Sequence, residues 1–318
     1  MIWGVSLIAI LIVSFMSGAR LRLQAAYNMA GAAKAEFIAK AAIDNEALSL
    51  LATQGEGPRS AQSVQAQSIV ARAAGVGRLP RTAHAGQPRL CVIDGVAVAI
   101  AVEDEGGKVD LNRASQELLT AMLKGFGVAK KEADFLARAI VDFRSTRPEP
   151  GQAGAGASPP EKPALFQTVF ELDQVAGVEA ALFRELLPYV TVHSRHPGLD
   201  PESAPPALFA ALVGLPAEQV RALEQAPYPN AIDRADPKFP SAFKQPGDGG
   251  ALLVHAEARL SSGQTSVLEA VLDLRSAGLE GGSAGQPFAI RELRRSVASR
   301  YAAALHAALT SAWTPPNC

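Results

Sequence analysis

The first 19 residues of the chain form one apolar stretch without a charge. At a rise of 1.5 Å per residue, a helix over Met1 to Ala19 reaches about 28 Å, the thickness of one hydrocarbon core. Trp3, Leu7, Leu11 and Phe15 belong to this stretch. The pattern predicts a helix that spans a membrane once.

Helical patterning continues after the apolar stretch. From Arg20 to about Gln54 the chain has no proline and is rich in Ala, Leu, Lys and Glu, which favour helices. Apolar residues recur there at intervals of three, four and seven, namely Ala26, Met29, Ala33, Phe37, Ala41, Leu48 and Leu51. We therefore expect one long N-terminal helix with an amphipathic second half, ending near the Gly and Pro residues of 55–58.

A cleavable signal peptide is the alternative for the first segment. Ser17-Gly18-Ala19 offers small residues of the kind that signal peptidase accepts. However, no basic region precedes the apolar residues, and a cleaved peptide does not need a helix that continues into the mature chain. The pattern therefore favours an anchor.

Two β-hairpins are predicted further along the chain. Arg89 to Val102 forms two apolar runs joined by Asp94-Gly95, a strong signal for a two-residue turn. Leu252 to Leu260 and Val267 to Leu274 alternate in polarity around the polar turn 261–264. These segments predict an antiparallel sheet.

The segment of about 135 residues between the hairpins is patterned as helices. Asp110 or Asn112 is suited to cap the first helix, and Gly125-Phe126-Gly127 ends it. A second helix is expected from about Ala129 to Arg144. Its inward residues are expected to be Ala133, Leu136, Ile140 and Phe143.

Another helical pair is expected between Phe170 and Val192, with Gly177 in its turn. The Pro- and Gly-rich residues 148–163 between the pairs predict a flexible loop. A weak echo of the first pair begins at Leu199, about 88 residues on, so one helical unit is used more than once. Near the end of the chain, Arg291 to Trp313 predicts an Ala-rich helix.

This order of elements predicts an α+β fold with a large, all-helical insert between the strands of an antiparallel sheet. We expect four parts. Residues 1–54 form the N-terminal helix, 55–105 the first part of the head, 106–242 the inserted helical domain, and 243–318 the second part of the head.

Composition narrows the possible functions. The 30 Lys and Arg residues nearly balance the 31 Asp and Glu residues, so the net charge of -1 gives no overall attraction to nucleic acid. The chain also lacks the HExxH, P-loop and paired CxxC motifs. Neither an enzyme nor a cofactor is expected.

Two polar clusters contain side chains that can ligate metals. His193 and His196 form an isolated H-x-x-H, which is expected to be solvated surface. Glu103-Asp104-Glu105 precedes two glycines and offers oxygen ligands for calcium, although a charged loop at a strand end is the favoured interpretation.

The insert also resembles a helix-hairpin-helix DNA-binding module. Gly125 to Gly127, followed by Lys130 and Lys131, presents backbone N–H groups and cations suited to a phosphate. The second turn, at Gly177, is flanked by acidic residues, and the insert lacks a basic face. A membrane-anchored DNA-binding or DNA-uptake protein is therefore the alternative, and no nucleic acid is expected as a partner.

Taken in order, these features resemble the K-type minor pseudopilins of type II secretion (general secretion pathway protein K). The matching elements after the N-terminal helix are Asp110-Leu-Asn, Ala139-Ile-Val-Asp-Phe-Arg144, Phe170-Glu-Leu, Val175-Ala-Gly177, Tyr189-Val-Thr-Val192 and Leu199. The resemblance implies a subunit anchored once in the inner membrane with its head in the periplasm. It also implies partners, which are the I- and J-type minor pseudopilins, other pseudopilus and secretion-channel components, and prepilin peptidase.

Two features depart from the pilin pattern. Most pilin-like subunits carry a Glu near the start of the mature helix, whereas Met1 to Ala19 contains no acid, which suits a subunit at the filament tip. The family also has a basic leader ending in Gly, so we expect the true start to lie several residues upstream of Met1.

A disulfide between Cys91 and Cys318 is the last expectation. Thiols in a periplasmic head lie in an oxidising compartment, and pilin-like heads often tie down their C-terminal segment. The alternative is that Cys91 is a small buried residue in a strand and that the chain end frays.

Overall fold

The computed structural model describes residues 2–54, 88–145, 165–225, 236, 238–247, 249–274, 288–296, 299–310 and 316–318. Among residues 2–13 it describes the side chains of Trp3 and Ile12 only. The predicted loop 148–163 and the Gly and Pro residues of 55–58 lie outside the described residues.

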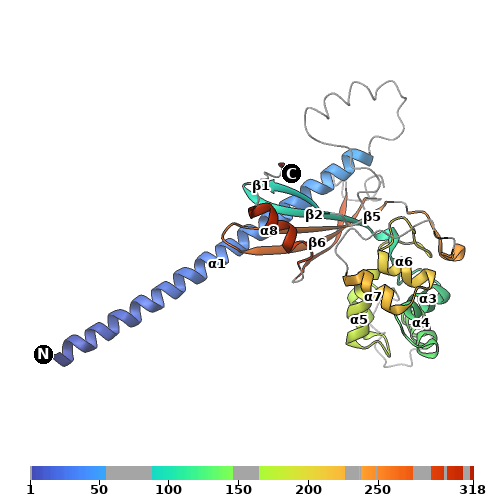
Figure 1. Cartoon of the computed structure of the whole chain (residues 1–318), viewed down its shortest axis with the longest axis horizontal. Coiled ribbons are helices and arrows are strands. Elements are labelled where there is room, and N and C mark those ends of the chain that lie inside the picture. Colours follow the sequence, from blue (N-terminus) through green and yellow to red (C-terminus); the bar gives the residue numbers. More distant parts are fainter. Residues whose placement is uncertain are drawn as a thin grey trace, which may run out of the picture.

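One helix, α1, runs without interruption from Ile2 to Gln54, as the sequence predicts. Its 53 residues correspond to about 80 Å of helix. Its N-terminal half extends away from the rest of the molecule, and its second half lies along the sheet (Figure 1).

The second half of α1 packs on the sheet through small and branched residues. The buried residues are Ala35, Ile38, Ala39, Ala42, Ile43, Ala47 and Leu50. Alanine at four of these positions lets the helix axis come close to the strands. The larger apolar residues of the predicted stripe lie on the opposite side of the helix, where Phe37 and Leu48 are exposed.

The head contains a five-stranded antiparallel sheet in the order β1-β2-β5-β6-β7. The strands are β1 (Arg89–Ile93), β2 (Val96–Asp104), β5 (Ala251–Arg259), β6 (Thr265–Asp273) and β7 (Ala289–Arg295). Both predicted hairpins are present. Asp94 and Gly95 join β1 to β2 with positive φ values of 49° and 73°, as a turn of type I′ requires.

The prediction of one Ala-rich helix over Arg291 to Trp313 is wrong. The chain first forms β7, the strand that closes the sheet, and only then the short helix α8 (Ala302–Thr310). β7 is a strand because it pairs with β6, which is a non-local contact that the charged sequence of this segment does not reveal.

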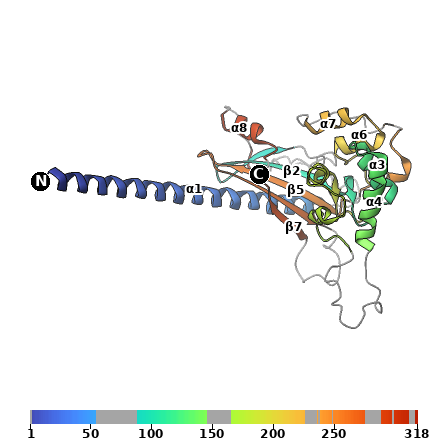
Figure 2. The same cartoon turned by 90° about the horizontal axis from the view of Figure 1, so that it is seen from below.

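Different elements cover the two faces of the sheet. α1 packs on one face, with Val98, Ile100 and Val254 among the apolar residues of the sheet that it covers. On the other face, alanines of β2 pack against Tyr301 and against Leu305 of α8. The helical insert also lies beside the sheet at the end away from the N-terminus (Figures 1 and 2).

The insert consists mainly of short helices around its own core. Its elements are η2 (Glu105–Gly107), β3 (Val109–Asp110), α3 (Gln116–Gly125), α4 (Lys130–Ser145), η3 (Val169–Gln174), α5 (Ala180–Leu186), η4 (Leu187–Tyr189), β4 (Val190–Thr191), α6 (Pro206–Val213), α7 (Ala217–Gln225) and η5 (Ser241–Phe243). The predicted helical pairs are present, including the repeated unit after Leu199. The insert is not entirely helical, because β3 and β4 form a short parallel pair.

The structure also corrects the predicted helix cap. Ser115 caps α3, because its side chain accepts a hydrogen bond from the Leu118 amide. The expected caps bond other segments instead: Asp110 is the last residue of β3, and Asn112 lies in the turn that follows it.

The described apolar core residues fall into three clusters: one between α1 and the sheet, one inside the insert, and a small one between β2 and α8. The contact between head and insert is largely polar, and this junction is described below. The architecture is thus the predicted α+β fold with a helix, a sheet head and an insert.

Candidate functional site

The outer face of α1 is the first candidate surface. Met29 and Phe37 are each 72% exposed and Leu48 is 58% exposed. Phe37 and Leu48 are three helical turns apart and so lie on the same side of the helix, opposite the sheet. The head therefore leaves an apolar strip of α1 uncovered.

The N-terminal half of α1 carries the residues predicted for a membrane helix. Trp3 and Phe15 are exposed, and the side chains of Leu7 and Leu11 fall outside the described part of the chain. Within the residues that are described, no helix has both the length and the apolar character needed to cross a membrane.

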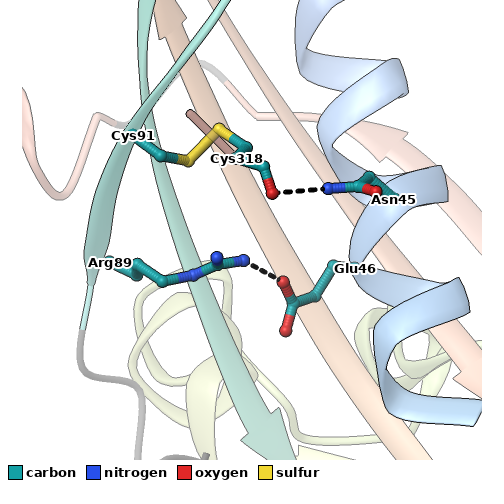
Figure 3. Close-up of a disulfide and its surroundings, with 5 residues drawn as sticks. All are labelled: Asn45, Glu46, Arg89, Cys91 and Cys318. Carbon is teal, nitrogen blue, oxygen red and sulfur yellow. Dashed lines mark hydrogen bonds and ion pairs between the residues drawn. A yellow bond between two sulfur atoms is a disulfide. The ribbon is translucent and has the colours of Figure 1, made fainter. Parts of the chain in front are cut away.

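The C-terminus closes onto β1 and α1 through the predicted disulfide. Cys91 and Cys318 are bonded, with Cα atoms 5.0 Å apart (Figure 3). The Val92 amide donates to the Pro316 carbonyl at 2.9 Å, and the Cys318 amide donates to the Val92 carbonyl at 3.2 Å. The last residues thereby act as a short extra strand along the outer edge of β1.

Two further contacts tie this corner to α1. The Asn45 side-chain amide donates to the Cys318 carbonyl at 3.1 Å. Arg89 of β1 forms an ion pair with Glu46, a carboxylate on the sheet-facing side of α1 that is only 1% exposed (Figure 3). Glu46 is a buried charge, and Arg89 is its ionic partner among the described residues, so this contact is sensitive to mutation.

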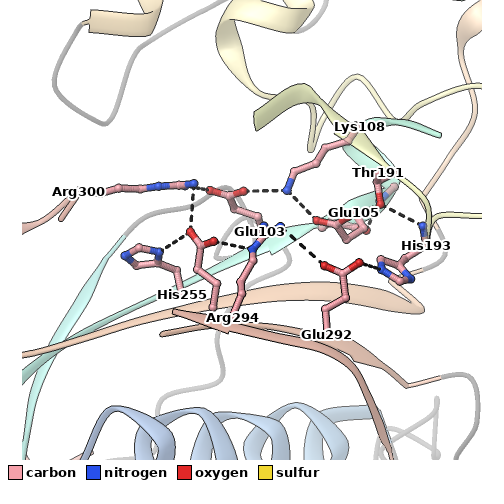
Figure 4. A network of polar contacts seen from close by, with 12 residues as sticks. Glu103, Glu105, Lys108, Thr191, His193, His255, Glu292, Arg294 and Arg300 are labelled. Atoms are coloured by element: carbon pink, nitrogen blue, oxygen red, sulfur yellow. Dashed lines mark hydrogen bonds and ion pairs between the residues drawn. The ribbon is translucent and has the colours of Figure 1, made fainter. Parts of the chain in front are cut away.

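The junction between sheet and insert is a network of charged groups (Figure 4). Lys108 is buried, and its ammonium lies 3.2 Å from Glu103 and 2.6 Å from Glu105. The Thr191 hydroxyl of β4 donates to Glu105. Burial would raise the pKa of Glu103, but Lys108 and Arg300 outweigh it and lower that pKa to about 2.

These contacts bear on the possible calcium site. Glu103 and Glu105 bond Lys108, and Asp104 accepts a hydrogen bond from the Gly106 amide. The carboxylate oxygens therefore face cations and N–H groups of the protein. Among the described residues, no group of His, Cys, Asp and Glu has an arrangement that could hold a metal ion.

The interpretation of His193 and His196 as solvated surface is wrong. His193 is half-buried and its Nε2 lies 3.0 Å from Glu292 of β7. His196 is also half-buried, and its Nδ1 lies 2.9 Å from the Gln245 amide nitrogen. Each ring therefore joins the insert to a neighbouring segment.

A buried histidine, which the sequence did not single out, organises the sheet face opposite α1. His255 of β5 lies 2.8 Å from Glu257 and 3.0 Å from Glu269. Burial would lower the pKa of His255, but the hydrogen bonds to both carboxylates outweigh it and raise that pKa. The pattern of β5 was a possible signal, because His255 and Glu257 are buried in a strand that is otherwise apolar up to Ala258.

This histidine also holds the segment that precedes α8. Glu257 accepts hydrogen bonds from the Arg300 and Tyr301 amides, and the Tyr301 ring meets the His255 ring edge-on. Burial would raise the pKa of Glu269, but His255 and the nearby arginines lower it to about 2. The cluster therefore carries charge inside the fold and stabilises the C-terminal segment.

The predicted turn residues of the insert have packing roles. A Cβ atom on Gly125 would lie 2.6 Å from the Ala211 carbonyl oxygen, so the close contact between α3 and α6 at this position requires glycine. Gly127 and Gly177 have φ values of 91° and 88°, which favour glycine. Lys130 and Lys131 are exposed at the start of α4.

Asp110 and Asn112 link segments that are distant in the sequence. Asp110 is buried and accepts hydrogen bonds from the Arg195 amide at 2.7 Å and the Ser194 hydroxyl at 3.1 Å. Asn112 exchanges two hydrogen bonds with the backbone of Phe166. Both residues therefore stabilise the insert, and burial raises the pKa of Asp110.

The protein-family comparison covers part of this architecture. Residues 99–195 match the family model for protein K of the type II secretion system. This segment is similar to protein K of that system. The match runs from β2 through the first helical pairs to the loop after β4, which confirms the resemblance inferred from the sequence.

A solved structure is also similar in outline. It is the crystal structure of the GspK-GspI-GspJ complex from the type 2 secretion system of enterotoxigenic Escherichia coli. The matched chain is 14% identical with a TM-score of 0.47, and the match covers 88% of this chain and 99% of that one. No curated protein matches the sequence.

Proposed function

We propose that the protein is a non-enzymatic minor pseudopilin of the K type. In this proposal, α1 anchors the chain once in the inner membrane after prepilin peptidase has removed a leader, and the head lies in the periplasm. The protein assembles with I- and J-type minor pseudopilins at the tip of the pseudopilus and supports export through the secretion channel. The family match of residues 99–195 supports this assignment.

The uncovered outer face of α1 carries the proposal. Met29, Phe37 and Leu48 are large apolar side chains that the head leaves in solvent. Fully burying such a side chain contributes about 1.5 to 3 kcal/mol, so the exposed fractions of these three are worth about 3 to 6 kcal/mol in a contact. A neighbouring helix that packs along this face would gain that stabilisation, as in a bundle of pilin-type helices.

Copurification tests the assembly. The full chain, expressed with the I- and J-type subunits of the same bacterium, should retain both partners through detergent extraction. Phe37→Asp combined with Leu48→Asp should abolish this, because a partner helix would have to bury two carboxylates. The matched control is Phe135→Asp, which changes a side chain on the insert that is 57% exposed. Partners retained at the unmodified level by the double variant would contradict the proposal.

Fractionation tests the anchor separately. The native chain should sediment with inner membranes and should be shortened when prepilin peptidase is present. Recovery of a soluble periplasmic chain that begins just after Ala19 would instead support the signal-peptide alternative.

A further inference from the structure

The two edges of the five-stranded sheet differ in what covers them. At one edge, residues 316–318 pair with β1. At the other edge is β7, which lies at the margin of the sheet (Figure 2). An exposed edge strand offers unpaired backbone groups to another chain, and charged side chains or a covering segment limit which chain can pair with it.

The hydrogen-bond pattern shows which groups of β7 are available. The Ser296 amide donates a hydrogen bond to the Val267 carbonyl of β6 at 3.0 Å. In an antiparallel ladder only every second residue bonds a given neighbour, so Ser296, Arg294 and Glu292 are the residues of β7 that bond β6. The amides of Glu292 and Arg294 therefore face β6, and those of Leu293 and Arg295 face outward. No described residue bonds these two outward amides.

The charges along this edge are arranged with the cations outside. Arg195 and Arg291 both bond Asp273, which is 4% exposed, and Arg294 bonds Glu269, which is 8% exposed. The side chains of the edge arginines are 25 to 74% exposed, and these residues are Arg195, Arg291, Arg294 and Arg295. Solvent at β7 thus meets guanidinium groups; the partners of Arg195, Arg291 and Arg294 are buried, whereas Arg295 pairs with Glu36 of α1, which is 39% exposed.

Side chains of an added strand would find surfaces on both faces. On the α1 side, Ile290 and Leu293 are exposed. On the insert side, a cavity of about 320 Å³ is lined by Phe170, Leu187 and Arg294, among others. An extended chain alternates its side chains between two faces and can use both.

We propose that the free edge of β7 binds an extended acidic segment of another protein, which joins the sheet as a sixth strand. The outward amides supply the main-chain hydrogen bonds of this mode of recognition, and the arginines select carboxylates. A second copy of β7 would bring like arginine charges together, which disfavours self-pairing. A nucleic acid would satisfy the arginines but has no peptide edge to pair with Leu293 and Arg295.

The test uses the full chain in mild detergent and a fluorescent probe peptide, acetyl-Thr-Val-Glu-Val-Glu-Val-Thr-amide, followed by anisotropy. Leu293→Pro removes an outward N–H group that β6 does not use, and proline is tolerated at such edge positions. Leu293→Ala is the matched control, because it shortens the same side chain but keeps the amide. We expect Leu293→Pro to weaken binding at least tenfold relative to Leu293→Ala. A peptide with Lys in place of Glu should not bind.

Amide exchange of the unmodified chain provides a readout that does not depend on the folding of the variant. The Leu293 and Arg295 amides should gain at least tenfold protection with the acidic peptide, and the inward amides of β7 should change little. Absence of this gain, or equal affinity of the two Leu293 variants, would overturn the proposal. Two further results would assign the edge to another occupant and also overturn the proposal. The first is duplex DNA that displaces the peptide and binds both Leu293 variants equally. The second is self-association of the chain that Leu293→Pro abolishes.

Discussion

Replacing Arg89 with alanine would leave Glu46 as a buried carboxylate without its ionic partner. Removing one member of a fully buried ion pair costs about 3 to 5 kcal/mol. Because Arg89 is itself 38% exposed, water reaches part of this site, and we expect a cost of about 2 to 3 kcal/mol. Glu46 lies on the face of α1 that packs on the sheet, so the loss should appear as easier detachment of α1.

Replacing the other partner of the ion pair, Glu46, should have a different effect. In Glu46→Leu, Arg89 can turn into solvent while the new side chain joins the apolar contacts around Ile43 and Leu50. We therefore expect a change within about 1 kcal/mol for Glu46→Leu, and a similarly small change for the double variant. The asymmetry between the two single variants is the main result to measure.

Amide exchange of α1, measured by mass spectrometry on the full chain in mild detergent, reports this opening. A loss of 2 to 3 kcal/mol corresponds to exchange about 30 to 150 times faster around Glu46. The reasoning is wrong if Arg89→Ala leaves exchange in α1 unchanged, or if Glu46→Leu accelerates it as much as Arg89→Ala does.

Three further predictions concern the C-terminus, pH and the insert. In Cys318→Ser, the Val92 amide should exchange at least tenfold faster in an NMR experiment, because the residues that bond it lose their covalent tether; unchanged exchange would show that hydrogen bonds alone hold the tail. The raised pKa of His255 gives stabilisation that is complete below pH about 6.5 and is lost as pH rises through that pKa. Glu269, with a pKa of about 2, stabilises the fold above pH about 4.5 and loses this effect as pH falls toward 2. The melting temperature should therefore be highest between pH about 4.5 and pH about 6.5. A melting temperature that does not change with pH would contradict both contributions. Gly125→Val should destabilise the insert by about 3 kcal/mol in a thermal melt, because its side chain would overlap α6, and an unchanged melt would contradict that close approach.

Local patterns were sufficient to predict much of the fold. The long α1, the Asp94-Gly95 hairpin and the helices of the insert follow from periodicity and from Gly and Pro signals within a few residues. The cysteine pair was also identifiable, because only two cysteines occur and one lies in a predicted strand.

Features that depend on distant contacts were not predictable. Asp110 has the chemistry of a helix cap, but its Oδ2 accepts hydrogen bonds from Ser194 and Arg195, more than 80 residues away, and its Oδ1 accepts from the Asn112 amide. Ser115 caps α3 instead. The same applies to β7, whose charged residues become a strand only beside β6.

Hydrophobicity alone also gave an incomplete picture of α1. Its largest apolar residues point away from the head, whereas alanines and Glu46 face the sheet. The shape of the sheet decides which side of α1 is buried, because the helix lies close to the strands and small residues are needed at the contact. The junction between head and insert was missed for a related reason, since its ion pairs join residues from four separate segments.

The bond between Cys91 and Cys318 makes a closed covalent ring from almost the entire head, spanning 227 positions of sequence separation. α1 is attached to this ring at a single point, as a tail is attached to a loop. A protease that cuts the backbone once anywhere inside the ring therefore opens it without releasing a fragment, and only a second cut or a reductant separates the pieces. The insert can thus be nicked while the head remains covalently joined to its N-terminal helix.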